Sequence, residues 1–154
     1  MAFLRIGWEE AAELCEELAR RIDFTPDIII GISRGGLVPA RILSDALGIK
    51  RVAILGMAFY RRISEKGTCP EITQELGMDV KGNLALLVDD VSDSGKSLLA
   101  AKAYLEGLGA HVKTATMHQK PGTTLVPDYC ASLTSDWIVY PWERHEVEKE
   151  MDGD

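Results

Sequence analysis

The pattern of apolar and polar positions in the first part of the chain predicts four elements in the order helix, strand, helix, strand. Trp8 to Ile22 places its apolar side chains on one broad face, as an amphipathic helix does. Asp27 to Ser33 is a short apolar run, typical of a strand buried on both faces. Leu37 to Leu47 has helical spacing and is followed by Gly48, a common helix end. Val52 to Tyr60 then predicts the second strand.

The same alternation returns in the second half of the chain. Leu84 to Val88 predicts a buried strand, Gly95 to Leu108 a helix closed by Gly109, and Val112 to His118 a further strand. Strands that alternate with helices of about ten or more residues favour a mostly parallel sheet with helices on both faces. The predicted fold class is therefore α/β, doubly wound.

Two segments depart from this pattern. Residues 61–81 are polar, mixed in charge and interrupted by glycine and proline, which predicts a flexible loop or a hairpin. After Gln119, tryptophan and tyrosine gather in a short region that we expect to form a small hood over the sheet edge, and Glu143 to Asp154 is so charged that we expect it to fray. The chain is thus predicted to be one domain, 1–154, with a core at about 1–119, the loop at about 61–81 and the hood at about 120–145.

Composition and charge exclude several classes of protein. The chain is 46% hydrophobic and 27% charged, and no apolar run approaches the length of a membrane span or of a signal-peptide centre, so we expect a cytoplasmic protein without a membrane partner. The net charge of -7 argues against a nucleic-acid partner, which normally requires a basic face. Neither the three cysteines nor the three histidines have the spacing of a disulfide framework or a zinc motif.

The segment from Leu86 to Ser97, LLVDDVSDSGKS, carries the strongest chemical signal. Ligands of an open parallel sheet bind beyond the carboxyl ends of its strands, where this segment lies. Asp93 to Ser97 opens the predicted helix, so its free amides can bind a phosphate, and Gly95 lets the backbone approach closely. Asp89 and Asp90 can accept hydrogen bonds from sugar hydroxyls and hold Mg²⁺. These features favour a sugar-phosphate site.

Two other interpretations of the segment are weaker. Each residue taken singly could be a helix cap or a strand end, but two adjacent acids behind a buried strand cost stability unless something uses them. Residues 94–97 also match the end of a nucleotide-binding P-loop. The first glycine of that motif would fall at Asp90, whose carboxylate would repel a phosphate.

LLVDDVSDSGKS closely resembles the phosphoribosyl pyrophosphate signature of the type I phosphoribosyltransferases. GISRGGLVPA, Gly31 to Ala40, resembles their pyrophosphate loop, and DWIVYPWE, Asp136 to Glu143, resembles the hood of the small xanthine and hypoxanthine-guanine members. The resemblance covers nearly the whole chain and is weakest from Arg61 to Lys81. It implies the type I fold and a purine phosphoribosyltransferase of purine salvage, which transfers the 5-phosphoribosyl group from phosphoribosyl pyrophosphate to a 6-oxopurine and releases pyrophosphate.

The resemblance also implies roles for individual residues. Asp93 would act near purine N7 as general base or hydrogen-bond acceptor, and Asp90, with Asp89, would bind Mg²⁺. Lys120 would donate to the exocyclic O6, which favours 6-oxopurines over adenine. The implied nucleobase contacts are Asp93, Lys120, Trp137 and Ile138, and the implied donor contacts are Arg34, Gly35, Asp89, Asp90, Val91, Ser92, Asp93, Ser94, Gly95, Lys96 and Ser97.

Several points stay open at the level of sequence. Xanthine, guanine and hypoxanthine differ at C2, where selectivity depends on backbone groups, and any of the loop cations Arg61, Arg62 and Lys66 could contact pyrophosphate. We expect Trp142 to pack in the core or in a dimer interface, and the aromatic hood makes a homodimer or higher homo-oligomer the expected state. The alternative functions are a phosphoribosyl-pyrophosphate-sensing regulatory protein of the same fold without turnover, and a structural domain with a vestigial site.

Overall fold

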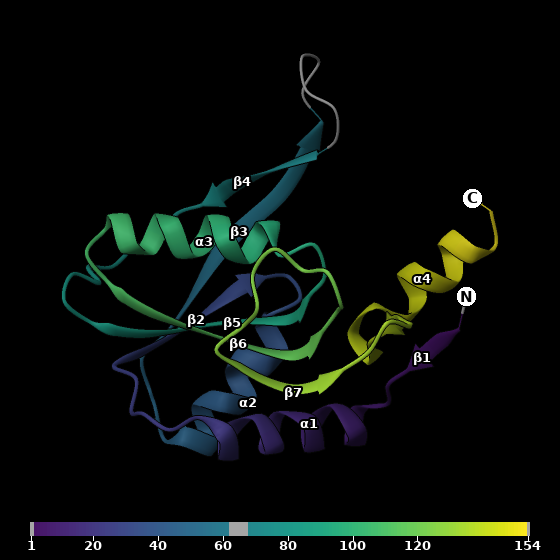
Figure 1. Cartoon of the computed structure of the whole chain (residues 1–154), viewed down its shortest axis with the longest axis horizontal. Coiled ribbons are helices and arrows are strands. Elements are labelled where there is room, and N and C mark those ends of the chain that lie inside the picture. The colour runs from purple at the N-terminus through teal and green to yellow at the C-terminus, as the bar shows by residue number, and fades with distance from the viewer. Residues whose placement is uncertain (1, 62–67, 154) are drawn as a thin grey trace.

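The computed structural model describes residues 2–61 and 68–153, which form three layers around one sheet (Figure 1). The sheet has six strands in the order β4-β3-β2-β5-β6-β7. Helices α1 (Trp8–Arg21) and α2 (Leu37–Leu47) cover one face and α3 (Lys96–Gly107) covers the other. The strands are β2 (Ile28–Ser33), β3 (Val52–Arg61), β4 (Thr68–Gln74), β5 (Leu84–Ser92), β6 (His111–Gln119) and β7 (Tyr129–Leu133). The predicted α/β class is confirmed.

All neighbouring strands of this sheet run parallel except β3 and β4. These two form the antiparallel hairpin that was one of the two predictions for residues 61–81, with Gly56 paired to Gln74 at one end and Arg61 to Thr68 at the other. Of the loop cations, Arg62 and Lys66 lie outside the described residues. None of the described helices has the length and apolar character needed to span a membrane.

The core consists of two apolar layers, one on each face of the sheet. Strand β2 divides its isoleucines between them, because successive side chains of a strand point to opposite faces. Ile28 and Ile30 pack on one face with Leu105 of α3. Ile29 packs on the other face with Leu18 of α1 and Leu43 of α2. Burial on both faces explains why this strand is an uninterrupted apolar run. Its parallel pairing with β5 brings the carboxyl ends of the two strands side by side.

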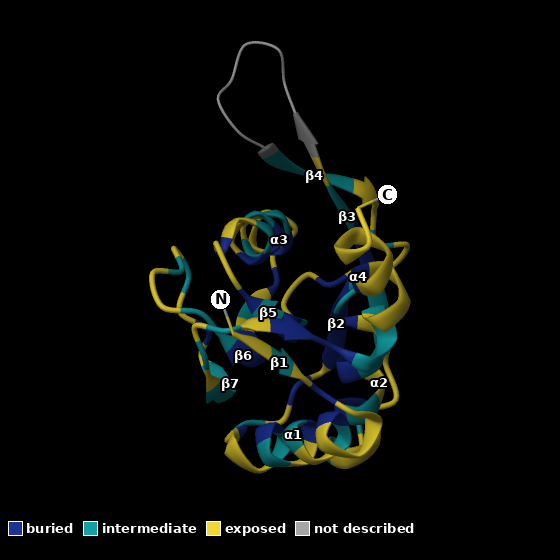
Figure 2. Cartoon of the chain, turned by 90° about the vertical axis from the view of Figure 1, so that its right-hand side faces the viewer, coloured by how far each residue is buried: buried dark blue, intermediate teal, exposed yellow. Residues whose placement is uncertain are grey.

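The hood lies at the end of the sheet toward which the parallel strands point (Figure 1). Its small second sheet pairs β1 (Phe3–Arg5) with β8 (Trp137–Val139) in parallel. The start of the chain therefore contributes to the hood, although the sequence assigned it to the core and the first helix. A third apolar cluster, with Ile6, Met117 and Ile138 among its members, packs the hood onto β6 and α1. Figure 2 shows β1 crossing in front of the strand ends.

The prediction that residues 143–154 are frayed is wrong for most of that segment. After the short 3-10 helix η1 (Pro141–Glu143), Arg144–Met151 forms helix α4. Two residues of this helix hold it in place. The side chain of Val147 is buried, and Glu146 forms an ion pair with Arg34 of the loop after β2. Strong charge predicted solvation, but the ion pair with Arg34 and the burial of Val147 connect this helix to the body of the protein.

Candidate active site

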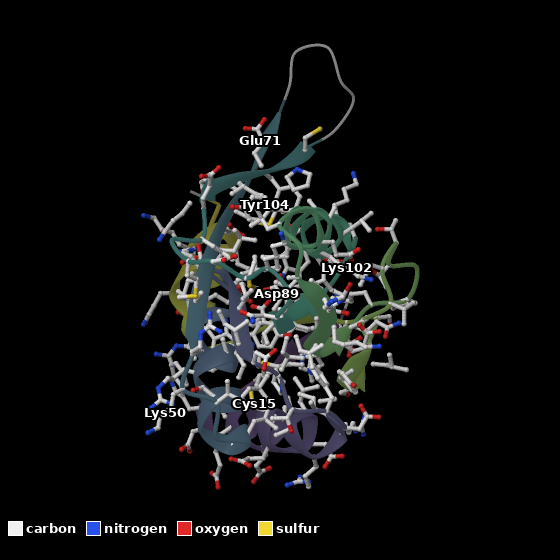
Figure 3. The ribbon with its side chains drawn as sticks, turned by 90° about the vertical axis from the view of Figure 1, so that its left-hand side faces the viewer. Cys15, Lys50, Glu71, Asp89, Lys102 and Tyr104 are labelled. Atoms are coloured by element: carbon white, nitrogen blue, oxygen red, sulfur yellow. The ribbon has the colours of Figure 1, made fainter. Side chains whose placement is uncertain are left out.

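Strand β5 continues through Asp89 and Asp90 and ends at Ser92, four residues later than the sequence predicted. It does so because β6 offers backbone partners as far as Gln119, which lies opposite Ser92. The two acids therefore belong to the sheet itself. Asp90 is only 8% exposed, Asp89 is partly exposed, and the amides of Asp90 and Val91 donate to the Asp89 and Asp90 carboxylates at 2.8 Å. Figure 3 shows Asp89 near the middle of the molecule.

The environment of this carboxylate pair disfavours two negative charges. Burial raises the pKa of both side chains, and the Asp90 carboxylate raises that of Asp89 further. Hydrogen bonds to the Asp90 carboxylate, among them the one from Trp142, lower its pKa and so oppose this rise. No ion pair between described side chains involves either acid. Buried carboxylates without a cationic partner are suited to a hard divalent cation such as Mg²⁺, which takes oxygen ligands.

Asp90 lies directly against the loop that follows β2. A Cβ atom at Gly35 would be 2.5 Å from Asp90 Oδ2, and one at Gly36 would be 2.4 Å from the carbonyl oxygen of Val88. Neither distance is possible for a side chain, so the two glycines let this loop contact β5. The Ser33–Arg34 peptide bond in the same loop is cis.

The Arg34 guanidinium projects from this loop and is largely exposed. It donates hydrogen bonds to both carboxylate oxygens of Glu146 at 2.8 and 2.9 Å. These bonds raise the pKa of Arg34 and lower that of Glu146. Such a two-pronged pairing has the geometry with which arginine also binds phosphate oxygens.

The predicted phosphate cradle lies at the start of α3, which begins at Lys96. Gly95 caps the helix with φ 84, a left-handed conformation, and a Cβ atom there would be 2.6 Å from Thr123 Oγ1. The loop containing Thr123 therefore supports the cradle from behind. The buried Ser92 hydroxyl also faces this loop, 2.8 Å from the Thr123 hydroxyl, so it is engaged within the protein. Ser94 Oγ accepts a hydrogen bond from the amide of Lys96 at 3.3 Å.

Two neighbouring pockets meet at Asp90 and Glu143. The first has a volume of about 470 Å³, and its lining includes Arg34, Gly35, Asp89, Asp90, Ser97, Trp142, Glu143 and Glu146. The second has a volume of about 260 Å³ and is lined by Asp90, Val91, Asp93, Lys120, Trp137, Ile138, Tyr140 and Glu143. Of the residues predicted from the sequence, Ser92, Ser94, Gly95 and Lys96 line neither of these two pockets.

The second pocket brings together all the residues predicted for the nucleobase. Asp93 comes from the segment between β5 and α3, Lys120 follows β6, and Trp137 and Ile138 belong to β8. The Lys120 ammonium group donates to the carbonyl oxygen of Asp136 at 2.5 Å, which fixes it beside the hood. Trp137 is 45% exposed as a residue and lines the second pocket, so its ring can stack on a ligand there.

Sequence reasoning missed several residues of the site, among them four in the terminal region. Trp142 packs against the third apolar cluster, as one of the two expectations for it had been, but it also lines the first pocket and donates from Nε1 to Asp90 Oδ2 at 3.3 Å. Tyr140, Glu143 and Glu146 were not assigned to the site. Their position within or next to DWIVYPWE was the available signal, but the motif does not say which side chains point toward the strands.

Comparison with known proteins identifies the class. Residues 6–149 match the family model described as phosphoribosyl transferase domain. The chain therefore belongs to the phosphoribosyltransferase family, which confirms the resemblance found in its sequence.

Individual relatives are similar over most of their length. The xanthine-guanine phosphoribosyltransferase of Idiomarina loihiensis is 33% identical over 144 residues, which cover 91% of this chain and 86% of the relative. The protein of the same name from Cereibacter sphaeroides is 31% identical over 146 residues, which cover 90% and 85%. The crystal structure of a purine phosphoribosyltransferase from Pyrococcus horikoshii superposes with a TM-score of 0.85 at 38% identity, covering 92% of this chain and 94% of that one.

Proposed function

We propose that this protein is a purine phosphoribosyltransferase, which transfers the 5-phosphoribosyl group from phosphoribosyl pyrophosphate to a 6-oxopurine and releases pyrophosphate. The observation that carries this proposal is the pair of adjoining pockets that share Asp90. The first offers Arg34 together with the paired acids Asp89 and Asp90, and the second offers Trp137, Lys120 and the separate acid Asp93. A transfer between two substrates requires such neighbouring sites. The names of the relatives in Idiomarina loihiensis and Pyrococcus horikoshii support it.

In the donor site, the sugar phosphate would lie across the ends of β2 and β5. Arg34 and the amide of Gly35 would contact the pyrophosphate, and the amides at the start of α3, with Ser97, would hold the 5-phosphate. Asp89 and Asp90 would accept hydrogen bonds from the ribose hydroxyls. These two carboxylates would also hold Mg²⁺, which when bound would neutralise charge on the leaving pyrophosphate.

In the acceptor site, a purine would enter the second pocket. Trp137 would stack on the ring, the Lys120 ammonium group would donate to O6, and the backbone of Ile138 would face C2. The Asp93 carboxylate would accept the hydrogen at N7 and so raise the electron density at N9. N9 would then form its bond to C1 of the ribose as the bond from C1 to the pyrophosphate oxygen breaks.

The test is to incubate the protein with phosphoribosyl pyrophosphate, Mg²⁺ and each nucleobase in turn and to measure pyrophosphate release. We expect release with xanthine, guanine or hypoxanthine, and much less with adenine, because its amino group offers no acceptor to Lys120. Absence of release with every base would contradict the proposal. Donor binding in calorimetry without any release would favour the regulatory alternative.

The variant Asp93→Asn probes the chemical step in the same assay. Asparagine retains the size of the side chain but is a poorer base, so turnover should fall at least about tenfold while the affinity for the donor changes little. Unchanged turnover would remove Asp93 from the mechanism.

The homo-oligomeric state and the cytoplasmic location expected from the sequence stay predictions. Light scattering during size-exclusion chromatography would test the first. A single-chain mass in solution would contradict it.

A further inference from the structure

Asp90 is held by two aromatic residues of the hood, 50 and 52 positions later in the chain. The Trp142 indole donates to its carboxylate oxygen Oδ2 at 3.3 Å. The Tyr140 hydroxyl donates to its main-chain carbonyl oxygen at 3.0 Å. One residue is therefore fixed both at its side chain and at its backbone from outside its own strand.

The hydrogen bond from Tyr140 has a definite direction because the group has only one proton. When the hydroxyl donates to the Asp90 carbonyl, His118 Nδ1, at 2.7 Å, donates to the hydroxyl oxygen. Tyr140 and His118 are each only 1% exposed, so water cannot readily replace either partner. The chain of contacts runs from β6 through the hood to β5.

Stacking fixes the orientation of the two aromatic rings. The rings of Tyr140 and Trp142 lie nearly parallel, with centroids 4.9 Å apart and an angle of 7° between the planes. Trp8 at the start of α1 also contacts Trp142, with a centroid distance of 5.9 Å and an angle of 57° between the planes. A rotation of Trp142 away from Asp90 would lose both contacts.

Gly35 also lies directly against the Asp90 carboxylate, since a Cβ atom there would be 2.6 Å from its Cγ. Asp90 is thus confined between the loop after β2 and the hood, at the boundary that the two pockets share. A carboxylate confined in this way keeps one orientation before any ligand arrives. Preorganisation of this kind lowers the entropic cost of binding.

We propose that Trp142 and Tyr140 are positioning residues, which hold Asp90 in the orientation that the donor site needs. This inference rests on the proposed function, because it assumes that Asp90 binds the phosphoribosyl donor. It assigns to the hood a second task besides contact with the base. The hood also completes the donor site.

The test is a calorimetric titration of the unmodified protein, Trp142→Phe and Trp8→Phe with phosphoribosyl pyrophosphate and Mg²⁺. Trp142→Phe keeps an aromatic ring but removes the N–H donor to Asp90 together with part of the stacked ring surface. We expect donor affinity to fall about tenfold, the lower end of what a hydrogen bond to a charged group contributes. Trp8→Phe touches the same ring without reaching Asp90 and should bind the donor within about twofold of the unmodified protein.

Steady-state kinetics and a second variant distinguish positioning from packing. The KM for the donor should rise by the factor seen in calorimetry, while kcat changes less. Tyr140→Phe, which keeps the stacked ring and removes the hydroxyl, should weaken donor binding in the same direction and provides the test if Trp142→Phe does not fold.

Two outcomes would overturn the inference: donor affinity unchanged in both Trp142→Phe and Tyr140→Phe, or an equal loss in Trp8→Phe, which would assign the effect to ring packing. An unmodified protein that binds no donor would instead refute the proposed function, and this inference with it.

Discussion

Asp90 and Gly35 contact each other across two strand ends, and the contact depends on the absence of a side chain at Gly35. The acid is buried and its pKa is raised by burial, so its ionised form is costly in the protein alone. A carboxylate that is costly to ionise in the protein alone is expected where ligand binding, and not stability, requires the acid. At this scale the sequence was informative, since two adjacent acids behind a buried strand cost stability unless something uses them, and Gly35 lies in the motif that resembles the pyrophosphate loop.

Gly35→Ala tests how closely the loop after β2 must approach β5. The new methyl group would lie 2.5 Å from Asp90 Oδ2, so the loop or the carboxylate has to move. We expect a loss of about 1–3 kcal/mol in the free energy of unfolding, as for other overpacked sites, and a loss of donor binding of at least about tenfold. Urea denaturation and calorimetry measure the two effects.

The matched control for this substitution is Gly77→Ala, where a Cβ atom would have nothing within 4 Å. It should change neither quantity appreciably. Equal effects of both substitutions would mean that close contact with Asp90 is not the reason for glycine at position 35.

At the scale of elements, most helices and strands of the core were predictable, whereas the end of β5 and the structure of the terminal segments were not. Helix α2 has the predicted bounds, because its apolar spacing and Gly48 are both local signals. Strand β5 extends to Ser92 because β6 continues beside it, and α4 forms because of Arg34 and the buried Val147. Local patterns contain no information on such partners.

Helix α4 contacts the proposed pyrophosphate site through Glu146. Its carboxylate occupies one edge of the Arg34 guanidinium, formed by Nη1 and Nη2, so a donor phosphate that binds at this edge has to displace it. Glu146→Gln removes this negative charge. We expect the KM for phosphoribosyl pyrophosphate to fall about two- to threefold, a modest effect because exposed ion pairs are weak.

Glu148→Gln is the matched control for the competition at Arg34. This residue lies on the same helix, with its carboxylate 3.9 Å from His145 Nδ1 and not in contact with Arg34. Its substitution should leave the KM for the donor unchanged at constant ionic strength. A KM that rises in Glu146→Gln would show that the carboxylate assists donor binding.

For the molecule as a whole, the hood is joined to the sheet through a buried polar contact between His118 of β6 and Tyr140. Burial lowers the pKa of His118 to about 4, so the folded protein keeps the imidazole neutral at pH 7. In the unfolded chain the ordinary pKa of histidine is about 6.5. The unfolded state therefore binds more protons between these two values.

The expected result is a pH-dependent loss of stability. The contribution of neutral His118 is present above about pH 6.5 and is lost as the pH falls toward 4, by up to about 3 kcal/mol. His118→Gln lacks this titration, so its unfolding free energy should fall less steeply over the same range. Urea denaturation at several pH values measures both slopes, and identical slopes would contradict the assignment.

The sequence by itself determined the alternation of buried strands and helices, the order of the three motifs and the chemistry at the ends of β2 and β5. It could do so because periodicity, helix ends and adjacent acids are local properties of the chain. Only the tertiary structure decided that β1 joins β8, that Arg34 pairs with Glu146, and that Trp142 and Tyr140 hold Asp90. Residues 50 or more positions apart make these contacts. Which side chains meet over such separations depends on the packing of whole elements, and no local pattern encodes it.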